Sequence, residues 1–461
     1  MMKKICFLII VFVFTACQPK QPKYIFYFIG DGMGVNQVLA TEMYLAAQKG
    51  YIGVDSLSFT NFPVRNFIST YSKYNAVTCS AAAGTALASG YKTKKGAIGM
   101  DSLLQTPLYS VAYNAKKAGK SVGIVTTVSI DHATPAAFYA HQPNRSMGFE
   151  IAKDAAASNF DFFAGSGFSQ CKKENESDII SLMQDSGYFI ARAIEQCLLQ
   201  KDAADKMVLL QCDSMSNLPY VIDRTPADLS LPQMTEAAIE YLDKNSDGFF
   251  LMIEGGLIDW ACHNNDAAAV IAEVEEFSDA IAKALDFYKK HADETLIVVT
   301  ADHETGGIAL GTGDYCLDLN VLQYQKCSVN ELTNKISALR EGGVFDWDNL
   351  KRLLQDNLGF WEELPLSDAE EYRLVSLYEQ TLKTMEMMKV HNLYFDNELI
   401  AQTAIDILNR KAKIGWTSYG HSAGVVPVYA IGCGADMFEQ VKDNVDIPRL
   451  MFQLLNNGPK Q

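Results

Sequence analysis

Acidic and histidine side chains stand at, or just beyond, the ends of apolar runs along this chain. The set comprises Asp31, Glu254, Asp259, His263, Asp302, His303 and His421. A single aspartate or histidine in such a place is more often a turn or structural residue, so the set is more informative than any one member. Asp259 and His263 are four residues apart, which on a helix places both on one face and suits one cation.

The composition of this set points to metal-assisted chemistry. Four of the seven histidines lie at such places, namely His132, His263, His303 and His421. Mixed aspartate and histidine ligation suits Zn²⁺, whereas an all-oxygen subset suits Mg²⁺. There are more candidate ligands than one ion needs, so we expect a cluster of two or three cations. Two neighbouring cations stabilise the attacking and leaving oxygens of an in-line phosphoryl displacement.

A thiol and a hydroxyl precede a run of small residues in VTCSAAAGTALASG, residues 77–90. Alanine favours a helix, and its small side chain lets other elements approach the first turn closely. The free N–H groups and the dipole of that turn would favour an anion. From this segment alone Ser80 or Cys79 is a candidate nucleophile, and a close-packed helix with an ordinary N-cap serine fits equally well.

The elements that must position these residues alternate between strand and helix. The strand candidates are YIFYFIGDG, KSVGIVTTVS, FDFFAGSG, KMVLLQC, DGFFLMIEGG, ETLIVVTADH and PVYAIGCG. Continuous apolar strands separated by amphipathic helices predict a three-layer α/β/α fold, with a mainly parallel sheet covered on both faces. Chemistry in such sheets gathers beyond the carboxyl ends of the strands. The alternation of strands and helices stops at about 317–392. This stretch is charged and helical and has no strand candidates, so it predicts a helical insertion.

The bulk composition limits the class of partner. The 461 residues are 48% hydrophobic, which allows a sizeable core, and the formal net charge is -16. So acidic a chain argues against recognition of nucleic acid or of an anionic membrane. It would also repel an anionic substrate unless bound cations or local arginines reverse the sign at the site. None of the ten cysteines forms a C-x-x-C pair, so neither a zinc ribbon nor a thioredoxin motif is visible.

The N-terminus carries a processing signal. Lys3 and Lys4 precede the apolar run 5–14, which is too short to span a bilayer. The sequence FTAC followed by QPKQPK resembles a bacterial lipoprotein signal, in which Cys17 is lipidated. We therefore expect a signal peptide at 1–16, a tether at 17–23 and a catalytic domain at 24–461, exported to the periplasm or outer membrane and anchored by the lipid. The alternative is an ordinary cleaved signal peptide with an incidental cysteine.

Six motifs, in order along the chain, resemble the alkaline phosphatase family. They are FIGDGMG, TCSAAAGTA, HATPAAFYAHQPNR, MIEGGLIDWACHNND, TADHETGG and YGHSAG. The resemblance covers nearly all of the mature chain. It implies the alkaline phosphatase fold and hydrolysis of small-molecule phosphate monoesters at a site with two Zn²⁺ ions and one Mg²⁺ ion. Family members are often dimers, so a homodimer is compatible with the resemblance, although no segment of the chain signals one.

The resemblance assigns the nucleophile and the first zinc. Ser80 would attack phosphorus and form a phosphoserine. Asp259, His263 and His421 would hold the zinc that activates water and contacts the leaving oxygen.

The same resemblance assigns the other two cations. Asp31, Asp302 and His303 would hold the zinc that lowers the pKa of the serine hydroxyl. Asp31 would also bridge to a third site, usually occupied by Mg²⁺ and completed by Thr134 and Glu254.

Arg145 would clamp two phosphate oxygens with its planar guanidinium. Two departures from the family pattern concern its surroundings. The family usually has aspartate directly before the nucleophile, where this chain has Cys79. Because that aspartate restrains the arginine, we expect Arg145 to be held more loosely here.

His132 takes a position, near the third metal, that is aspartate in some members and histidine in others, so the identity of the third ion stays open. Trp260 is expected to shape the phosphate pocket from outside the ligand set.

Three alternative functions fit the motifs less well. A sulfatase would need proline and arginine two and four residues after Cys79, where this chain has Ala81 and Ala83. A phosphodiesterase of the same superfamily usually carries a threonine nucleophile and lacks the arginine motif. A non-catalytic metal- or phosphate-binding lipoprotein would be expected to lose Ser80, Arg145 or a zinc ligand, and all are present.

Overall fold

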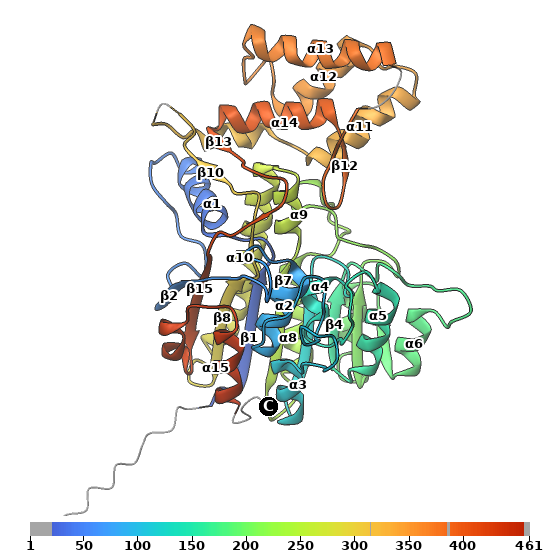
Figure 1. Cartoon of the computed structure of the whole chain (residues 1–461), viewed down its shortest axis with the longest axis vertical. Coiled ribbons are helices and arrows are strands. Elements are labelled where there is room, and N and C mark those ends of the chain that lie inside the picture. The colour runs from blue at the N-terminus through green and yellow to red at the C-terminus, as the bar shows by residue number, and fades with distance from the viewer. Residues whose placement is uncertain (1–20, 314, 385–387, 456–461) are drawn as a thin grey trace, which may run out of the picture.

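The computed structural model describes residues 21–313, 315–384 and 388–455 (Figure 1). The predicted signal peptide and Cys17 lie outside the described residues. A nine-stranded sheet has the order β2-β15-β8-β1-β7-β3-β4-β6-β5. Its strands are β1 (Tyr24–Gly30), β2 (Val64–Ile68), β3 (Ser121–Thr126), β4 (Phe162–Gly165), β5 (Tyr188–Ala191), β6 (Lys206–Leu210), β7 (Phe249–Gly255), β8 (Thr295–Ala301) and β15 (Val426–Gly432). The predicted mainly parallel α/β fold is confirmed.

All seven predicted strands lie in this sheet, and two further strands extend it. β2 and β5 are edge strands of five and four residues, and their sequences VRNFI and YFIA give little apolar periodicity. β15 runs antiparallel to both β8 and β2, whereas the other neighbours in the sheet pair in parallel.

The pairing register brings the carboxyl ends of the central strands to one edge. Gly30 at the end of β1 is level with Gly255 of β7 and with Ala301 of β8. Glu254 is level with Thr126 at the end of β3. The residues directly after these strands therefore meet above one edge of the sheet.

Helices cover both faces, and alternation along β1 shows this directly. Phe26 and Phe28 pack against rings from α10, whereas the Tyr27 hydroxyl donates a hydrogen bond to the Leu87 carbonyl of α2. Successive strand residues point to opposite faces, so α10 and α2 lie on opposite sides. The helices outside the insertion are α1 (Val35–Gln48), α2 (Ser80–Ser89), α3 (Val111–Lys117), α4 (Ala133–Ala136), α5 (Gly148–Ala157), α6 (Ile179–Asp185), α7 (Ile194–Gln200), α8 (Leu231–Leu242), α9 (Leu257–His263), α10 (Ala267–Tyr288) and α15 (Asp446–Leu454).

A second layer of helices sits beyond the carboxyl edge of the sheet (Figure 1). It comprises α11 (Val329–Glu341), α12 (Trp347–Leu358), α13 (Asp368–Thr384) and α14 (Leu399–Lys411) and has its own buried apolar cluster. Two features differ from the sequence prediction. A short strand, β11 (Lys389–His391), lies inside the stretch and pairs with β12 (Asp396–Glu398), and α14 continues the helical region beyond residue 392. β11 is polar and largely exposed, so it shows no apolar alternation.

Three smaller features complete the description. β9 (Glu304–Thr305) pairs with β14 (His421–Ser422), and β10 (Ala309–Leu310) pairs with β13 (Ile414–Gly415). Among the described residues, no cysteine forms a disulfide bond. Among the described residues, no helix combines the length and the apolarity that crossing a membrane requires.

Candidate active site

The first ligand group joins α9 to the far C-terminal part of the chain. Asp259 and His263 lie on one face of α9, with His263 Nε2 3.4 Å from Asp259 Oδ2. His421 approaches from β14, and its Nε2 lies 3.8 Å from Asp259 Oδ1. The β9–β14 pairing holds His421 there, supported by a hydrogen bond from the Ser422 hydroxyl to Glu304. One cation could contact all three side chains.

The second ligand group forms where β1 and β8 end side by side. His303 Nε2 lies 3.1 Å from Asp302 Oδ2 and 3.4 Å from Asp31 Oδ1, and all three side chains are fully buried. The Gly32 N–H donates to Asp302 Oδ1 at 3.1 Å. That bond orients the carboxylate and leaves its other oxygen free.

A third group shares Asp31 with the second. Glu254, at the end of β7, and His132 gather beside it, with His132 Nδ1 3.9 Å from Glu254 Oε1. The Thr134 hydroxyl donates to Asp31 Oδ2 at 3.5 Å, so Thr134 lies at the same place. The structure thus brings all nine sequence-predicted metal ligands into three adjoining groups.

Two observations show that these groups fit cations. Each histidine of the first two groups has its Nδ1 engaged: His263 with the Tyr419 carbonyl at 2.5 Å, His421 with the Thr78 carbonyl at 2.9 Å, and His303 with the Thr305 hydroxyl at 3.2 Å. When Nδ1–H donates a hydrogen bond to an oxygen of the protein, the lone pair on Nε2 remains available to bind a metal. The inward-facing atoms without a hydrogen-bond partner are Asp31 Oδ1, His132 Nδ1, Glu254 Oε1, Asp259 Oδ2, His263 Nε2, Asp302 Oδ2 and His421 Nε2. Buried polar atoms are normally satisfied, so this cluster of orphaned ligand atoms is what a metal centre requires.

The shifted pKa values of the buried carboxyl groups also indicate that the site needs positive charge. Burial and the nearby Asp259 raise the pKa of Asp302 to about 8. Burial and the charge of Asp302 raise the pKa of Asp31 well above its ordinary value. Burial opposes ionisation of Asp259 as well, but His263 beside it holds the pKa of Asp259 well below the ordinary value. Bound cations would allow all of these carboxylates to ionise together.

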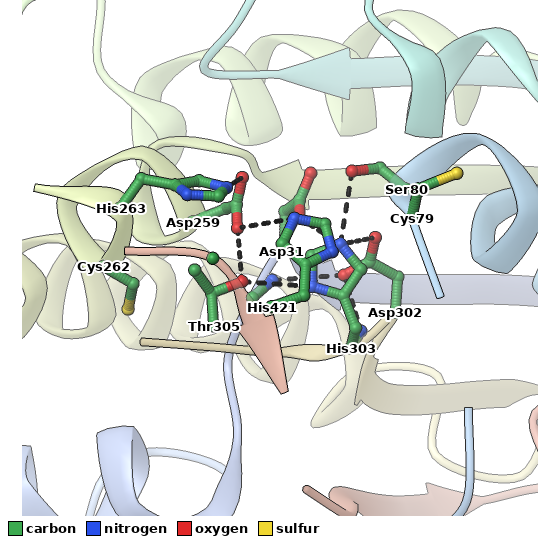
Figure 2. A network of polar contacts seen from close by, with 12 residues as sticks. Asp31, Cys79, Ser80, Asp259, Cys262, His263, Asp302, His303, Thr305 and His421 are labelled. Atoms are coloured by element: carbon green, nitrogen blue, oxygen red, sulfur yellow. Dashed lines mark hydrogen bonds and ion pairs between the residues drawn. The ribbon is translucent and has the colours of Figure 1, made fainter. Parts of the chain in front are cut away.

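Ser80 is the first residue of α2 and points into the ligand cluster. Its Oγ lies 3.2 Å from His303 Nε2 (Figure 2). Cys79 occupies the N-cap position, and its thiol points away and accepts a hydrogen bond from the Gly96 N–H at 3.3 Å. Of the two candidate nucleophiles in the sequence, only the serine therefore faces the metal ligands.

Arg145 has an acceptor other than the residue at position 79. Its Nη2 lies 3.0 Å from His132 Nε2, and the hydroxyl of Tyr394 lies 3.5 Å from the same nitrogen. A looser hold on Arg145 than in the rest of the family stays a prediction.

Several supporting residues gave no sequence signal. Thr305 donates to Asp259 Oδ1 at 2.5 Å, and Thr126 donates to Glu254. Thr126 is the last residue of β3, so inspection of the predicted strand ends for hydroxyls would have found it, whereas Thr305 ends the two-residue strand β9, which the sequence does not predict. Tyr394 lies in the insertion, about 250 residues from Arg145, and no local pattern marks it.

A cavity of about 1110 Å³ opens over the site. Arg145, His263 and His421 line it, together with Val77, Lys95 and Tyr419. Cys79, directly before Ser80, lines it as well, so the cavity reaches the start of α2.

An α/β sheet whose strand ends hold three cation-binding groups around a helix-borne serine defines a metal-dependent phosphoryl-transfer hydrolase. The alkaline phosphatase family model matches residues 22–163 and 172–457. Alkaline phosphatase 3 of Bacillus subtilis is 33% identical over 442 residues, covering 94% of this chain and 88% of that protein. The chain therefore belongs to the alkaline phosphatase family and is a metal-binding phosphoric monoester hydrolase.

Solved structures agree with this assignment. A cold-active alkaline phosphatase from a psychrophilic Shewanella sp. is 30% identical with a TM-score of 0.79, and the match covers 94% of this chain and 99% of that one. The Thermus thermophilus alkaline phosphatase is 26% identical with a TM-score of 0.77, covering 96% and 93%. A TAB5 alkaline phosphatase mutant with a histidine changed to aspartate, 26% identical with a TM-score of 0.66 and covering 96% and 100%, has Mg bound in its M3 site.

Proposed function

We propose that this enzyme hydrolyses phosphate monoesters through a phosphoserine on Ser80, at a site that takes two Zn²⁺ ions and one Mg²⁺ ion. The position of the Ser80 hydroxyl carries the proposal, because it lies 3.2 Å from His303 Nε2 at the N-terminus of α2. A phosphate placed there would meet the free N–H groups of the first helical turn.

The chemistry of the donors supports this division of metals. The groups Asp259–His263–His421 and Asp31–Asp302–His303 mix nitrogen and oxygen donors, as zinc prefers. The third group has the oxygens of Asp31, Glu254 and Thr134, which suit Mg²⁺, together with His132. The Mg in the M3 site of the TAB5 mutant is consistent with magnesium here. When bound, the cations would supply positive charge that favours ionised nucleophiles and stabilises the oxygens of the transferring phosphoryl group.

The side chains have distinct roles in the reaction. The guanidinium of Arg145 holds two non-bridging phosphate oxygens and so orients phosphorus towards Ser80. Ser80 Oγ then gives up its proton to solvent and forms a bond to phosphorus as the bond to the alcohol oxygen breaks, and that oxygen takes up a proton from solvent as the alcohol leaves. Water attacks the phosphoserine from the vacated side, which releases inorganic phosphate and restores the Ser80 hydroxyl.

The leaving group meets a wide cavity rather than a fitted pocket. The lining mixes apolar Val77 and Leu393 with Lys95 and Asn144, and the space is about 1110 Å³. Every contact assigned above falls on the phosphate, so we propose that the enzyme accepts varied monoesters. Turnover confined to one monoester would contradict this.

The test is to trap the phosphorylated enzyme. Acid quenching during turnover of a labelled monoester should leave phosphate on Ser80, and Ser80→Ala should abolish the adduct. Cys79→Ala is the matched control, because its thiol points away from the ligands. Phosphate found on Cys79 or Thr78 would overturn the assignment. Faster cleavage of a diester than of the matching monoester would favour the phosphodiesterase alternative.

Metal dependence is tested separately. Chelation should abolish turnover, and Zn²⁺ with Mg²⁺ should restore it; chelator-resistant turnover would contradict the metal assignment. Measurement of bound zinc and magnesium in the restored enzyme gives the number of each ion directly.

We also propose that the protein is exported to the periplasm or outer membrane and anchored there through lipidated Cys17. The FTAC–QPKQPK sequence supports this location. A homodimer is the assembly that the family resemblance suggests, and sedimentation of the purified protein tests it.

A further inference from the structure

The β11–β12 hairpin carries a loop from the insertion to the active site. Figure 1 shows this hairpin reaching down from the helical layer towards α9. The loop between the two strands, residues 392–395, includes Leu393 and Tyr394, and both line the cavity above the ligand cluster. The insertion thus contributes directly to the wall of the phosphate site.

The ring of Tyr394 is held by aromatic contacts next to the first metal group. It stacks on Trp260 with centroids 4.1 Å apart and an interplanar angle of 17°. It meets His263 edge-on at 5.3 Å, and Phe395 packs edge-on against the same tryptophan at 5.5 Å. Trp260 directly follows the candidate ligand Asp259 on α9. Its contact with Tyr394 therefore fixes the position of the tyrosine ring relative to the metal ligands.

The loop backbone is fixed to the same helix by side-chain amides. Asn264 directly follows His263, and its Oδ1 accepts from Asn392 Nδ2 at 2.6 Å and from Asn397 Nδ2 at 2.8 Å. Asn392 Oδ1 in turn accepts from the backbone N–H groups of Tyr394 and Phe395 at 2.9 and 2.8 Å. The hydroxyl of Tyr394 therefore has a defined position relative to the metal ligands.

That hydroxyl lies beside Arg145. It is 3.5 Å from His132 Nε2, and the same nitrogen lies 3.0 Å from Arg145 Nη2. A guanidinium has only donors, so each partner must present a lone pair. His132 does so at Nε2 only in the tautomer whose Nδ1 carries the proton and therefore cannot bind the third cation, whereas a tyrosine hydroxyl always has lone pairs. Tyr394 can therefore hold Arg145 in either tautomer of His132.

We propose that Tyr394 is a positioning residue of the phosphate site, which holds Arg145 in the orientation that binds two phosphate oxygens. In this chain it takes over the restraint that the aspartate before the nucleophile gives elsewhere in the family. The inference rests on the proposed role of Arg145. This positioning role makes the helical insertion part of the active site, because the insertion contains the tyrosine whose hydroxyl lies beside the arginine.

The test measures inorganic phosphate binding by calorimetry on metal-loaded enzyme, together with kcat and KM. Tyr394→Phe keeps the ring on Trp260 and removes only the hydroxyl. We expect phosphate to bind about five- to thirtyfold more weakly, which corresponds to the entropy of ordering a free arginine side chain. KM should rise while the content of zinc and magnesium stays unchanged. Tyr378→Phe is the matched control, since Tyr378 lies in the same insertion and packs against Phe345 and Trp347.

A double-mutant cycle with Arg145→Ala separates the possible outcomes. If Tyr394 acts through Arg145, adding Tyr394→Phe to Arg145→Ala should change phosphate binding no further. Additive losses, a loss of bound metal in Tyr394→Phe, or unchanged phosphate binding in that variant would each overturn the positioning role. If Arg145→Ala alone leaves phosphate binding unchanged, the proposed role of the arginine fails first, and that result is distinct from the others.

Discussion

Metal removal should make the stability of this enzyme fall as pH rises. In the metal-free protein the pKa of Asp302 is raised to about 8 by burial and by Asp259, against an ordinary value of 3.8. Between these two values the folded state keeps a proton that the unfolded state has released. The free energy of unfolding therefore falls with pH by about 1.4 kcal/mol per pH unit for each such proton. This stability is fully present below about pH 4 and is lost as pH rises through about 8.

Other ionisable groups determine the pH range in which the contribution of Asp302 to stability is easiest to measure. Burial and the charge of Asp302 raise the pKa of Asp31, which adds a loss of the same sign. Burial lowers the pKa of His303 and His421, so these histidines make the free energy of unfolding rise with pH while the unfolded chain loses their protons. This opposing contribution ends near the ordinary histidine pKa of 6.5. Burial and Glu276 raise the pKa of Glu273 to about 8, but this pair lies away from the metal groups and affects both preparations equally. The quantity to compare is the difference in slope between chelated and metal-loaded protein from pH 7 to 8.

The assay is thermal unfolding of both preparations at constant ionic strength, with metal content measured in each. A slope of about 1.4 kcal/mol per pH unit lowers the Tm of a chain of this size by about 1–2 °C per unit. Asp302→Asn in chelated form is the control: it should lose most of the excess slope and unfold at a higher temperature than chelated wild type at pH 8. Equal slopes with and without metal, or an unchanged slope in Asp302→Asn, would refute the reasoning.

Three further predictions concern single residues. Ser80→Ala should lower kcat by about a thousandfold or more in a steady-state monoesterase assay, because the covalent route is lost; a loss below tenfold would contradict a serine nucleophile. Cys79→Asp should change the inhibition constant of inorganic phosphate by less than about threefold, because the guanidinium of Arg145 already lies 3.0 Å from His132 Nε2, with the Tyr394 hydroxyl 3.5 Å from the same nitrogen. A much tighter constant in that variant would show that these acceptors leave the arginine free. Cys17→Ala should release the protein from the membrane fraction, and retention in that fraction would disprove the lipid anchor.

The sequence alone was enough to predict the fold class and to single out the candidate metal ligands that the structure brings together. Seven continuous apolar runs separated by helical patterns predict a buried parallel sheet, because each run must bury both of its faces. Ligands that directly follow such runs, as Asp31 and Asp302 do, are brought to one edge by the topology itself. The spacing of Asp259 and His263 predicted their shared helical face, and α9 has it. These features depend on local periodicity, which a sequence displays directly.

The sequence did not decide contacts between distant segments. His421 joins Asp259 only because β14 pairs with β9 after the insertion has returned to the sheet. The edge strands β2 and β5 have only five and four residues, which is too short to show a periodic pattern. Tyr394 meets Arg145 and Trp260 only because amides in the insertion bind the end of α9. Such contacts depend on how whole layers pack, and no local sequence pattern records that packing. The tertiary structure therefore decided which side chains surround Arg145.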